Sequence, residues 1–353
     1  MKIPLHVLAR KKTTDFINKI FSQFNNNKDC SQYIDKDEIK SILIIRPNYR
    51  IGNLIFLTPL INELNKYIPE AKIDIIVGMK LAGEILKPLP NVDKIISIPR
   101  ELLLKPLEMY QFIKQTRAKK YDLALNIMGA SSSSQLVTSL IKAKYKAAYY
   151  NEKSWTALTH TVEYLNTHKH IGLQSLELLK LFNLDVPMTD LKLDIKITSK
   201  EAQIAKLDLQ NLLKKTHIDE RTKIIALFRN ARFDKKITDE WWNDWINELK
   251  VLNDNIVIID ILSPDIPKKL NKEILEYSNK NLRLLGAFFK ECDLYISADT
   301  GPMHLAAGSG AKVLALFNKT SIGAFGALGN KNKTIDINHL SAQDVAKITK
   351  DFL

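Results

Sequence analysis

The feature that most constrains the fold of this chain is a regular alternation of short, apolar, β-branched runs with amphipathic stretches, which begins at Ser41. Short apolar runs predict buried strands, and apolar residues spaced three or four positions apart predict helices. Strands that alternate with helices form parallel βαβ units with right-handed crossovers, and ligands bind at the carboxyl ends of the strands. The sequence therefore predicts an α/β fold built on doubly wound parallel sheets.

The alternation occurs twice, with a connection between residues 185 and 199 that contains Pro187. The predicted strands of the first half are 41–46, 72–77, 94–98, 121–126 and 145–149, followed by a helix at 171–184. Those of the second half are 223–228, 255–261, 293–297 and 312–317, with helices at 239–252 and 342–352. A chain of 353 residues is longer than an ordinary domain with a single hydrophobic core. We therefore predict two domains, over 41–187 and 188–353, that face each other across a cleft.

The composition is typical of a soluble globular protein, with 45% hydrophobic and 26% charged residues. No apolar run is long enough to cross a bilayer, and the N-terminus lacks the pattern of a secretory signal, so we expect a cytoplasmic protein. Cys30 and Cys292 stand too far apart in the sequence to indicate a metal site or a disulfide framework.

The net charge of +13 favours anionic partners. The sequence has no zinc-finger spacing, no basic region leading into heptads and no aromatic segment of the RNA-recognition type. We therefore rank phosphorylated metabolites and membrane surfaces above nucleic acid, which we do not expect as a partner.

Residues 1–40 form a basic N-terminal extension. Up to Lys28 it carries six basic residues against the single acid Asp15, a net charge of +5 (6 − 1). Apolar residues recur at helical spacing in Phe16, Ile17, Ile20, Phe21 and Phe24. An amphipathic helix of this kind can lie on an anionic membrane, or it can pack on the body of the protein with its lysines in water.

The strongest local motif runs from Cys292 to Gly308, where an apolar strand ends at Ala298 and a helix follows Gly301-Pro302. Asp299 and Thr300 can cap this helix, and proline is well tolerated in a first helical turn. The free amides and the dipole at such a helix start bind anions such as a diphosphate. His304, one turn later, could donate to a phosphate or sugar oxygen, although a lone histidine is more often structural.

The motif Asp299-Thr-Gly-Pro-Met-His-Leu-Ala-Ala307 resembles the signature of glycosyltransferase family 9, the lipopolysaccharide heptosyltransferases. Three further stretches are similar to family motifs in the same order along the chain, at residues 44–60, 121–129 and 227–242. The resemblance covers nearly the whole chain after residue 40. It implies a GT-B architecture, in which two Rossmann-like domains hold the sugar acceptor in the N-terminal half and a sugar nucleotide in the C-terminal half.

The resemblance also implies transfer with inversion at the anomeric carbon and without a required metal or cofactor. The sequence agrees, because no Asp-x-Asp pair stands at a strand end and no histidine cluster is present. Fixed donors and cations must then stabilise the departing diphosphate. The residues expected on the donor side are Asn230, Arg232, Lys235, Asp299, Thr300, Gly301 and His304. Lys235 is expected to face the turn at Asp299 across the groove between the domains; the alternative interpretation is a solvated surface lysine beside Lys236.

The acceptor side is expected at Gly52, Asn53 and Gly129, and the catalytic positions at Asn53 and Asp299. The family carries an aspartate, thought to act as general base, where this chain has Asn53. A carboxamide can orient a hydroxyl but cannot accept its proton, and loss of a base typically costs about a hundredfold to ten thousandfold in rate. Asn53 could position the acceptor while the proton leaves late, another acid could take over, or the protein could bind its ligands without turnover.

The usual donor in the family is ADP-heptose, and the acceptor is a Kdo or heptose of the lipopolysaccharide core in the inner leaflet. Six further basic residues are Arg100, Lys105, Lys114, Arg117, Lys119 and Lys120. An anionic acceptor at that membrane would explain them, and so would a solvated helix face. A different hexose donor, a sugar-nucleotide epimerase and a nucleic-acid-binding protein are the alternatives. We expect a monomer, and we interpret Trp241, Trp242 and Trp245 as anchors of a helix rather than a sugar platform.

Overall fold

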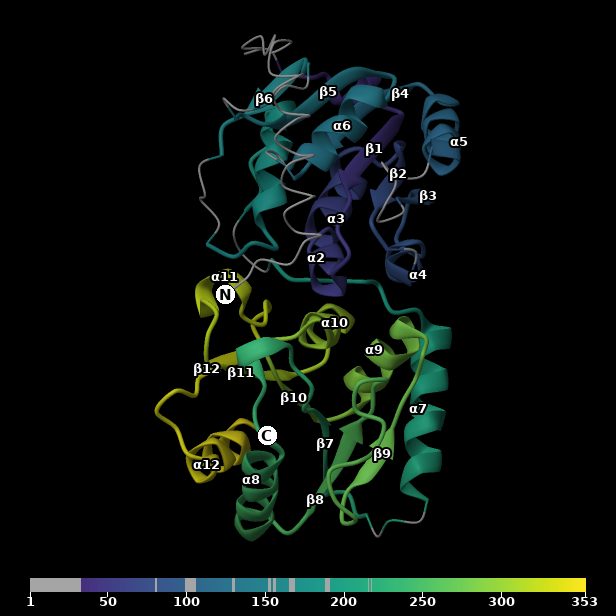
Figure 1. Cartoon of the computed structure of the whole chain (residues 1–353). Coiled ribbons are helices and arrows are strands. Elements are labelled where there is room, and N and C mark those ends of the chain that lie inside the picture. Colours follow the sequence, from purple (N-terminus) through teal and green to yellow (C-terminus); the bar gives the residue numbers. More distant parts are fainter. Residues whose placement is uncertain are drawn as a thin grey trace.

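The computed structural model describes residues 33–79, 81–98, 106–128, 131–151, 154, 157–164, 169–187, 191–214, 216 and 218–353. It consists of two halves, each built on a six-stranded sheet (Figure 1). The predicted amphipathic helix before residue 33, Cys30, Gly129 and the pair Arg100 and Lys105 lie outside the described residues. None of the helices in the described ranges combines the length and the apolar character needed to cross a membrane.

The first sheet has the strand order β3-β2-β1-β4-β5-β6, and all neighbouring strands are parallel. Its strands are β1 (Ser41–Arg46), β2 (Lys72–Val77), β3 (Val92–Ser97), β4 (Tyr121–Asn126), β5 (Ala143–Tyr149) and β6 (His160–Val162). Its helices are η2 (Lys36–Glu38), α2 (Ile51–Ile55), α3 (Thr58–Tyr67), α4 (Leu81–Leu86), α5 (Pro106–Arg117), α6 (Ser132–Leu140) and η4 (Gln174–Phe182). The winding direction reverses between β1 and β4, and such a switch point is where open α/β sheets bind ligands.

The second sheet repeats this plan with the order β12-β11-β10-β7-β8-β9, again entirely parallel. Its strands are β7 (Lys223–Phe228), β8 (Ile256–Ile261), β9 (Leu275–Tyr277), β10 (Leu294–Ala298), β11 (Val313–Phe317) and β12 (Lys333–Asp336). Its helices are α7 (Ser199–Leu213), η5 (Phe233–Lys235), α8 (Asp239–Leu252), α9 (Leu282–Glu291), α10 (Gly301–Ser309), α11 (Ile322–Phe325) and α12 (Ala342–Phe352). The switch point of this sheet lies between β7 and β10.

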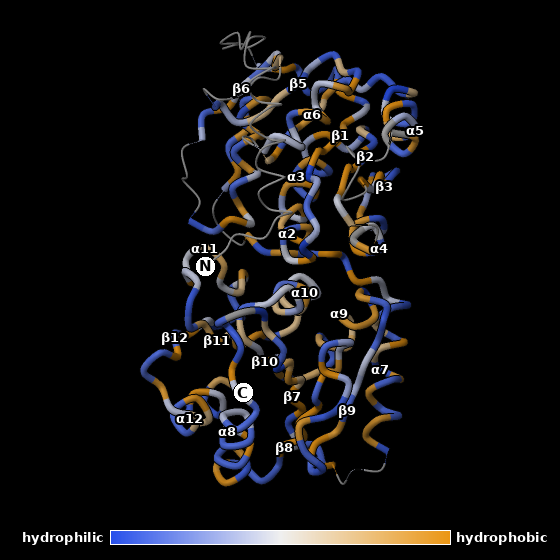
Figure 2. Tube along the Cα trace, viewed as in Figure 1, coloured by the Kyte–Doolittle hydropathy of each residue, from blue (hydrophilic) through white to orange (hydrophobic). Residues whose placement is uncertain are grey.

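The predicted α/β fold with two parallel sheets is confirmed, and the central strands are buried on both faces, as parallel sheets require. Hydrophobic residues concentrate along these strands, whereas the outer helix α7 alternates between hydrophobic and hydrophilic residues (Figure 2). The prediction missed β6, β9 and β12, because strands of three or four residues at a sheet edge carry too few apolar positions to stand out. The helix predicted at 171–184 is the shorter 3-10 helix η4.

One cluster of buried apolar side chains extends through both halves. It includes Ile55 and Phe56 from the first half, Leu193 and Ile195 from the connection, and Leu305 from α10. The backbone N–H of Ile195 also donates to the carbonyl of Gly308 at 2.8 Å. The two halves are therefore joined by a shared core as well as by the chain. The domain boundary at 187/188 stays a prediction.

The tryptophans of α8 lie in a separate cluster on the other face of the second sheet. Trp242 and Trp245 are fully buried, and Trp241 packs against the same cluster. The indole N–H of Trp245 donates to the hydroxyl of Thr349 on α12 at 3.3 Å. The interpretation of these residues as helix anchors is confirmed.

Candidate functional site

The carboxyl edge of the second sheet carries the motif that stood out in the sequence. Strand β10 ends at Ala298, and α10 begins at Gly301 with Pro302 in its first turn. Thr300 is the N-cap, and its hydroxyl accepts the amide of Met303 at 3.3 Å. The predicted strand, turn and helix are therefore present, at the switch point between β7 and β10.

Lys235 is not a free surface lysine. Its ammonium forms an ion pair with Oδ2 of Asp299, and the hydroxyl of Thr320 donates to the same oxygen. Lys235 belongs to η5 after β7, Asp299 follows β10, and Thr320 follows β11. Three neighbouring strands thus direct a cation, a carboxylate and a hydroxyl to one point beside the start of α10.

This arrangement corrects one expectation. Lys235 was expected to face the Asp299 turn across the groove between the domains, yet both residues belong to the second half and contact each other directly. The cause is the parallel sheet, which brings the loops after β7 and β10 to the same edge. The sequence analysis also missed Thr320, although its position just after a buried strand is the signal that could have revealed it.

Asn230 and Arg232 border the same edge less tightly. The Asn230 amide nitrogen lies 3.5 Å from Oγ of Ser263 and 3.4 Å from Oδ2 of Asp265, both in the loop after β8. Arg232 is exposed, and its guanidinium makes no hydrogen bond to the residues that the structure describes. Contact of these two side chains with a donor stays a prediction.

A buried arginine that the sequence analysis did not single out fixes these loops. Arg229, 6% exposed, donates from Nε to Asp260 at 2.9 Å and from Nη1 to Asp239 at 2.9 Å. Its Nη2 donates to the carbonyl of Lys268. Burial raises the pKa of Asp260, and the hydrogen bond from Arg229 opposes that rise. Arg229 thereby ties the ends of β7 and β8 to the start of α8.

His304 lies at the contact between the two halves. Its side chain is 4% exposed, and its ring meets the ring of Phe56 edge-on at a centroid distance of 4.5 Å. Burial lowers its pKa to about 3, so the imidazole is neutral at physiological pH. Its Nδ1 makes no hydrogen bond to any described residue. Packing between the halves is therefore a demonstrated role of His304.

Gly52 and Asn53 lie in the short helix α2, not in a turn, and this helix meets the start of α10. A Cβ atom on Gly52 would lie 2.8 Å from Cδ2 of His304, and one on Gly301 would lie 3.6 Å from the Gly52 nitrogen. Helices α2 and α10 consequently face each other across the boundary between the halves (Figure 1). Asn53, next to Gly52, is half-buried, and its amide makes no hydrogen bond within the described ranges. The expected acceptor and donor turns are thus adjacent.

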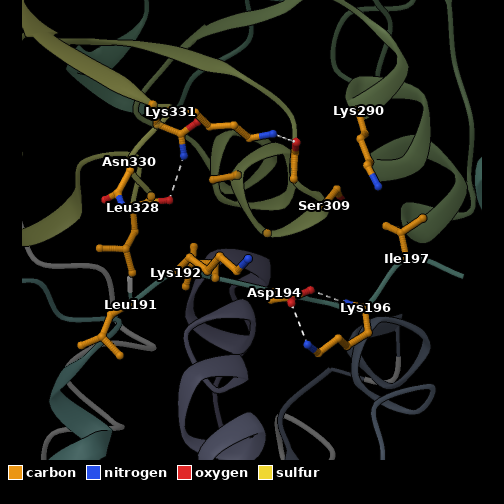
Figure 3. Close-up of a pocket in the computed structure, with 16 residues that line it drawn as sticks. Leu191, Lys192, Asp194, Lys196, Ile197, Lys290, Ser309, Leu328, Asn330 and Lys331 are labelled. Carbon is orange, nitrogen blue, oxygen red and sulfur yellow. Dashed lines mark hydrogen bonds and ion pairs between the residues drawn. The ribbon is translucent and has the colours of Figure 1, made fainter. Parts of the chain in front are cut away.

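Two cavities border the interface, but neither contains a predicted site residue. The larger, about 670 Å³, lies at the C-terminal end of α10 and receives lysines from three separate segments, Lys192, Lys290 and Lys331 (Figure 3). The smaller, about 390 Å³, is lined by His170, Gly326 and Leu328 among others. The predicted donor residues lie at the opposite end of α10, where the side chain of Lys235 retains 31% exposure.

Among the described residues, no three His, Cys, Asp or Glu side chains are arranged to hold a metal ion. Lys119, one of the basic residues considered for an anionic acceptor, has a structural contact instead. It pairs at 3.1 Å with Asp74, a fully buried carboxylate that also accepts the hydroxyl of Tyr121 at 2.7 Å.

Residues 109–352 match the family model described as glycosyltransferase family 9 (heptosyltransferase), which covers more than half of the chain. The chain belongs to glycosyltransferase family 9. It is accordingly a glycosyltransferase, and the resemblance inferred from the sequence motifs is confirmed. The matched region begins after Asn53, so the family model itself does not extend to the altered turn.

Curated relatives of this family 9 member carry names of the same kind. Lipopolysaccharide core heptosyltransferase OpsX of Haemophilus influenzae is 23% identical and covers 79% of each chain. Putative lipopolysaccharide heptosyltransferase 4 of Escherichia coli is 26% identical, over 87% of this chain and 84% of its own.

Solved structures support the architecture. A family 9 glycosyltransferase from Veillonella parvula superposes with a TM-score of 0.74 at 15% identity, covering 92% of this chain and 99% of its own. The E. coli heptosyltransferase WaaC with ADP gives 0.71 at 20% identity, covering 89% and 100%. At this identity the likeness concerns the fold, and it confirms the GT-B architecture of two Rossmann-like domains.

Proposed function

We propose that this protein is an inverting, metal-independent glycosyltransferase that transfers heptose from ADP-heptose to the lipopolysaccharide core. The observation that carries the proposal is the meeting of Lys235, Asp299 and Thr320 at the start of α10, directly beside Gly52 and Asn53 of helix α2. The solved E. coli relative WaaC was obtained with ADP and with ADP-2-deoxy-2-fluoro heptose. Two relatives are named for the lipopolysaccharide on which they act.

On the donor side, the diphosphate would lie at the start of α10, against the amides near Thr300 and Gly301. A diphosphate near Lys235 would compete with Asp299 for its ammonium, since both are anionic. Asp299 would then be available to orient hydroxyl groups of the donor sugar, with Asn230 and Arg232 at the rim. Preorganised donors of this kind stabilise the charge that develops on the leaving group, and the loss of one typically costs about a hundredfold to a thousandfold in rate.

On the acceptor side, Asn53 would orient the attacking hydroxyl beside Gly52, and Gly129 stays a predicted acceptor contact outside the described residues. The proton would leave late, once the oxocarbenium-like centre has made the hydroxyl acidic. The same asparagine supports a second candidate, a homologue that binds a sugar nucleotide or glycan without turnover. A third candidate is an active glycosyltransferase that uses a different hexose donor.

The anionic donor and the membrane-anchored acceptor place the enzyme in the cytoplasm, on the inner face of the cytoplasmic membrane. Under this proposal it acts as a monomer, binds no nucleic acid and uses no cofactor. Flotation with anionic vesicles and analytical ultracentrifugation would check the membrane association and the monomeric state.

Incubation of the purified protein with ADP-heptose and truncated lipopolysaccharide tests the reaction. We expect a β- or α-linked product whose anomeric configuration is opposite to that of the donor, and unchanged turnover after treatment with EDTA. Tight ADP binding without any glycoside would instead favour the binding protein. Turnover with another nucleotide sugar only would identify the different hexose donor.

The phosphate site has a separate test in Lys235→Met. We expect ADP affinity to fall by about tenfold to a hundredfold, because charge-assisted hydrogen bonds are worth roughly 1.5–3 kcal/mol. Adenosine, which lacks the phosphates, should bind both proteins equally in calorimetric titrations. Lys236→Met, at the exposed neighbouring lysine, is the matched control. Equal ADP affinity in the Lys235 variant and the control would exclude the proposed phosphate contact.

A further inference from the structure

Arg46 ends strand β1 at the switch point of the first sheet, where β1 and β4 lie side by side. Its side chain is 8% exposed. It follows Ile42 and Ile44 on one face of the strand, and the electrostatic neighbour that acts on it is Tyr149 at the end of β5. The guanidinium therefore lies at the carboxyl edge of the first half, on the sheet face that α2 covers.

The guanidinium of Arg46 differs from those of the other two buried arginines in its lack of partners. Arg229 is paired with Asp260 and Asp239, and Arg283 with Glu201. By contrast, Nε of Arg46 is enclosed and makes no hydrogen bond, and no carboxylate among the described residues lies within ion-pair distance. Burial lowers the pKa of Arg46 to about 10, and the only group in the described ranges that opposes this shift is Tyr149, not a carboxylate.

Such a group destabilises the protein on its own. A buried charge without a partner costs several kcal/mol, and at a pKa of about 10 the guanidinium stays charged at physiological pH. Tyr149 does not compensate this charge, because burial raises the pKa of its hydroxyl, which therefore stays neutral and donates to the carbonyl of Gln174 at 2.6 Å. Packing alone would be served better by an apolar side chain, so the position points to an anion that binds there.

We propose that Arg46 is the anion-binding group of the acceptor half, and that it receives a carboxylate or phosphate of the acceptor glycan. The Nε and Nη donors of a guanidinium form a fork that binds such groups with two parallel hydrogen bonds. The site lies at the start of the loop that leads from β1 to Asn53, so an anchored acid would hold the acceptor beside the reacting turn. This inference rests on the proposed function, from which it takes the identity of the acceptor half.

The first test is the stability of the ligand-free protein. We expect Arg46→Met to raise the thermal midpoint by a few degrees, because it removes a desolvated charge and keeps the side-chain volume. Arg229→Met, which breaks a paired arginine, should lower the midpoint. A fall of similar size in both variants would show that Arg46 has a structural role and would overturn the proposal.

The second test is direct binding of small anions. Glucuronate and inorganic phosphate, titrated at constant ionic strength, should raise the thermal midpoint of the natural protein, whereas the neutral glucuronamide should not. Neither anion should stabilise Arg46→Met. Equal stabilisation of both proteins would reveal an adventitious ion only, and no stabilisation of the natural protein would equally refute the site. The anion that raises the thermal midpoint more would show whether the site prefers the carboxylate of a sugar acid or the phosphate of a phosphorylated sugar.

The third test uses turnover and separates this inference from the proposed reaction. With an acceptor whose acidic group has been converted to a neutral ester, the natural protein should show a KM at least about tenfold higher, while kcat changes little. Arg46→Met should show the same high KM with either acceptor, and its ADP affinity should match that of the natural protein. A protein without any turnover would refute the proposed function, yet the stability and anion-binding results would still decide the role of Arg46.

Discussion

Under the proposed function, the chemistry on the acceptor side depends on the side chain of Asn53 in helix α2. It is half-buried beside Gly52 and makes no hydrogen bond to a described residue, so a carboxylate of nearly the same size fits there without breaking a contact. We expect Asn53→Asp to raise kcat by about tenfold or more, since a general base contributes about a hundredfold to ten thousandfold where it limits the rate. Steady-state kinetics measure the effect.

The pH profile provides the control for this variant. If the new carboxylate accepts the proton, the rate of Asn53→Asp should fall at acidic pH where that carboxylate becomes protonated, and the natural protein should lack this limb. An unchanged or lower rate would mean that the asparagine is adapted to its role, or that another group removes the proton.

His304 makes the stability of the protein depend on pH. Its folded-state pKa of about 3 lies below the ordinary value of 6.5, so between these values the unfolded chain binds more protons than the folded protein. Stability is therefore highest above pH 6.5 and falls as the solution becomes more acidic. At pH 4.5, two pH units below the ordinary pKa, we expect His304 alone to cost about 3 kcal/mol, from roughly 1.4 kcal/mol per pH unit.

Chemical denaturation at pH 7 and at pH 4.5 measures this contribution. Between these pH values, the free energy of unfolding should fall less in His304→Met than in the natural protein. His170, whose pKa is also lowered by burial, should retain a similar dependence of smaller size in that variant. The exposed His339→Gln controls for the loss of an imidazole. A pH dependence identical in His304→Met and the natural protein would show that this ring is not the titrating group.

The short helix α2 and the start of α10 form the closest contact between the elements of the two halves. A Cβ atom on Gly52 would meet the His304 ring at 2.8 Å, which is too close, whereas one on Gly301 would make ordinary contacts at 3.6 Å. We expect Gly52→Ala to lower the thermal midpoint and to weaken the packing of α2 on α10. Overpacking of this kind typically costs about 1–3 kcal/mol.

Gly301→Ala is the matched control, because it adds the same methyl group on the facing helix, where it would make only ordinary van der Waals contacts. The free energy of unfolding of this variant should lie within about 0.5 kcal/mol of that of the natural protein, apart from small effects of helix propensity. Equal destabilisation by the two substitutions would contradict the close packing of Gly52 against His304.

Arg283 holds the two halves in one relative orientation. This side chain of α9 is 3% exposed and pairs with Glu201 of α7 at 2.6 Å. It also donates to the carbonyl of Ile85 in the first half at 3.0 Å, and to those of Ile195 and Lys196 in the connection at 2.8 Å. One guanidinium thus ties together the first half, the connection and the second half.

We expect Arg283→Met to cost about 3–5 kcal/mol, because it leaves a carboxylate and buried carbonyls without their donor. Limited proteolysis should then cut the connection between η4 and α7 faster. Lys250→Met, which breaks a surface pair with Glu273 at 2.6 Å, should cost less than about 1 kcal/mol and leave the cleavage rate unchanged. Similar cleavage rates in both variants would mean that the shared apolar core alone fixes the orientation.

Most of the long elements could be read from the sequence. The alternation of apolar runs and amphipathic stretches placed β1, β2, β4, β7, α8 and α12 at their observed bounds, because buried central strands and two-sided helices leave a clear periodic pattern. Short edge strands such as β6 and β9 leave none. The 3-10 geometry of η4 was also hidden, since its apolar residues have the spacing of an ordinary helix.

The candidate site was predictable only in part. The cap at Thr300 and the turn at Gly301 follow from local rules, so the sequence alone was sufficient to place the start of α10. The partner of Lys235 could not be predicted from the sequence, because Asp299 is far from it along the chain. The two side chains come together only through the pairing of β7 with β10. Arg46 and Arg229 look alike in the sequence, and only their surroundings show that one is paired and the other is not.

By itself, the sequence determined the family, the α/β class and the local geometry of each turn, because these depend on residue types and spacings over a few positions. Tertiary structure decided which charges meet, that His304 lies neutral between the halves, and that Lys235 faces Asp299 within one half. The physical reason is that burial and ion pairing depend on contacts between residues far apart in the chain. Such contacts exist only after the two sheets have formed and docked.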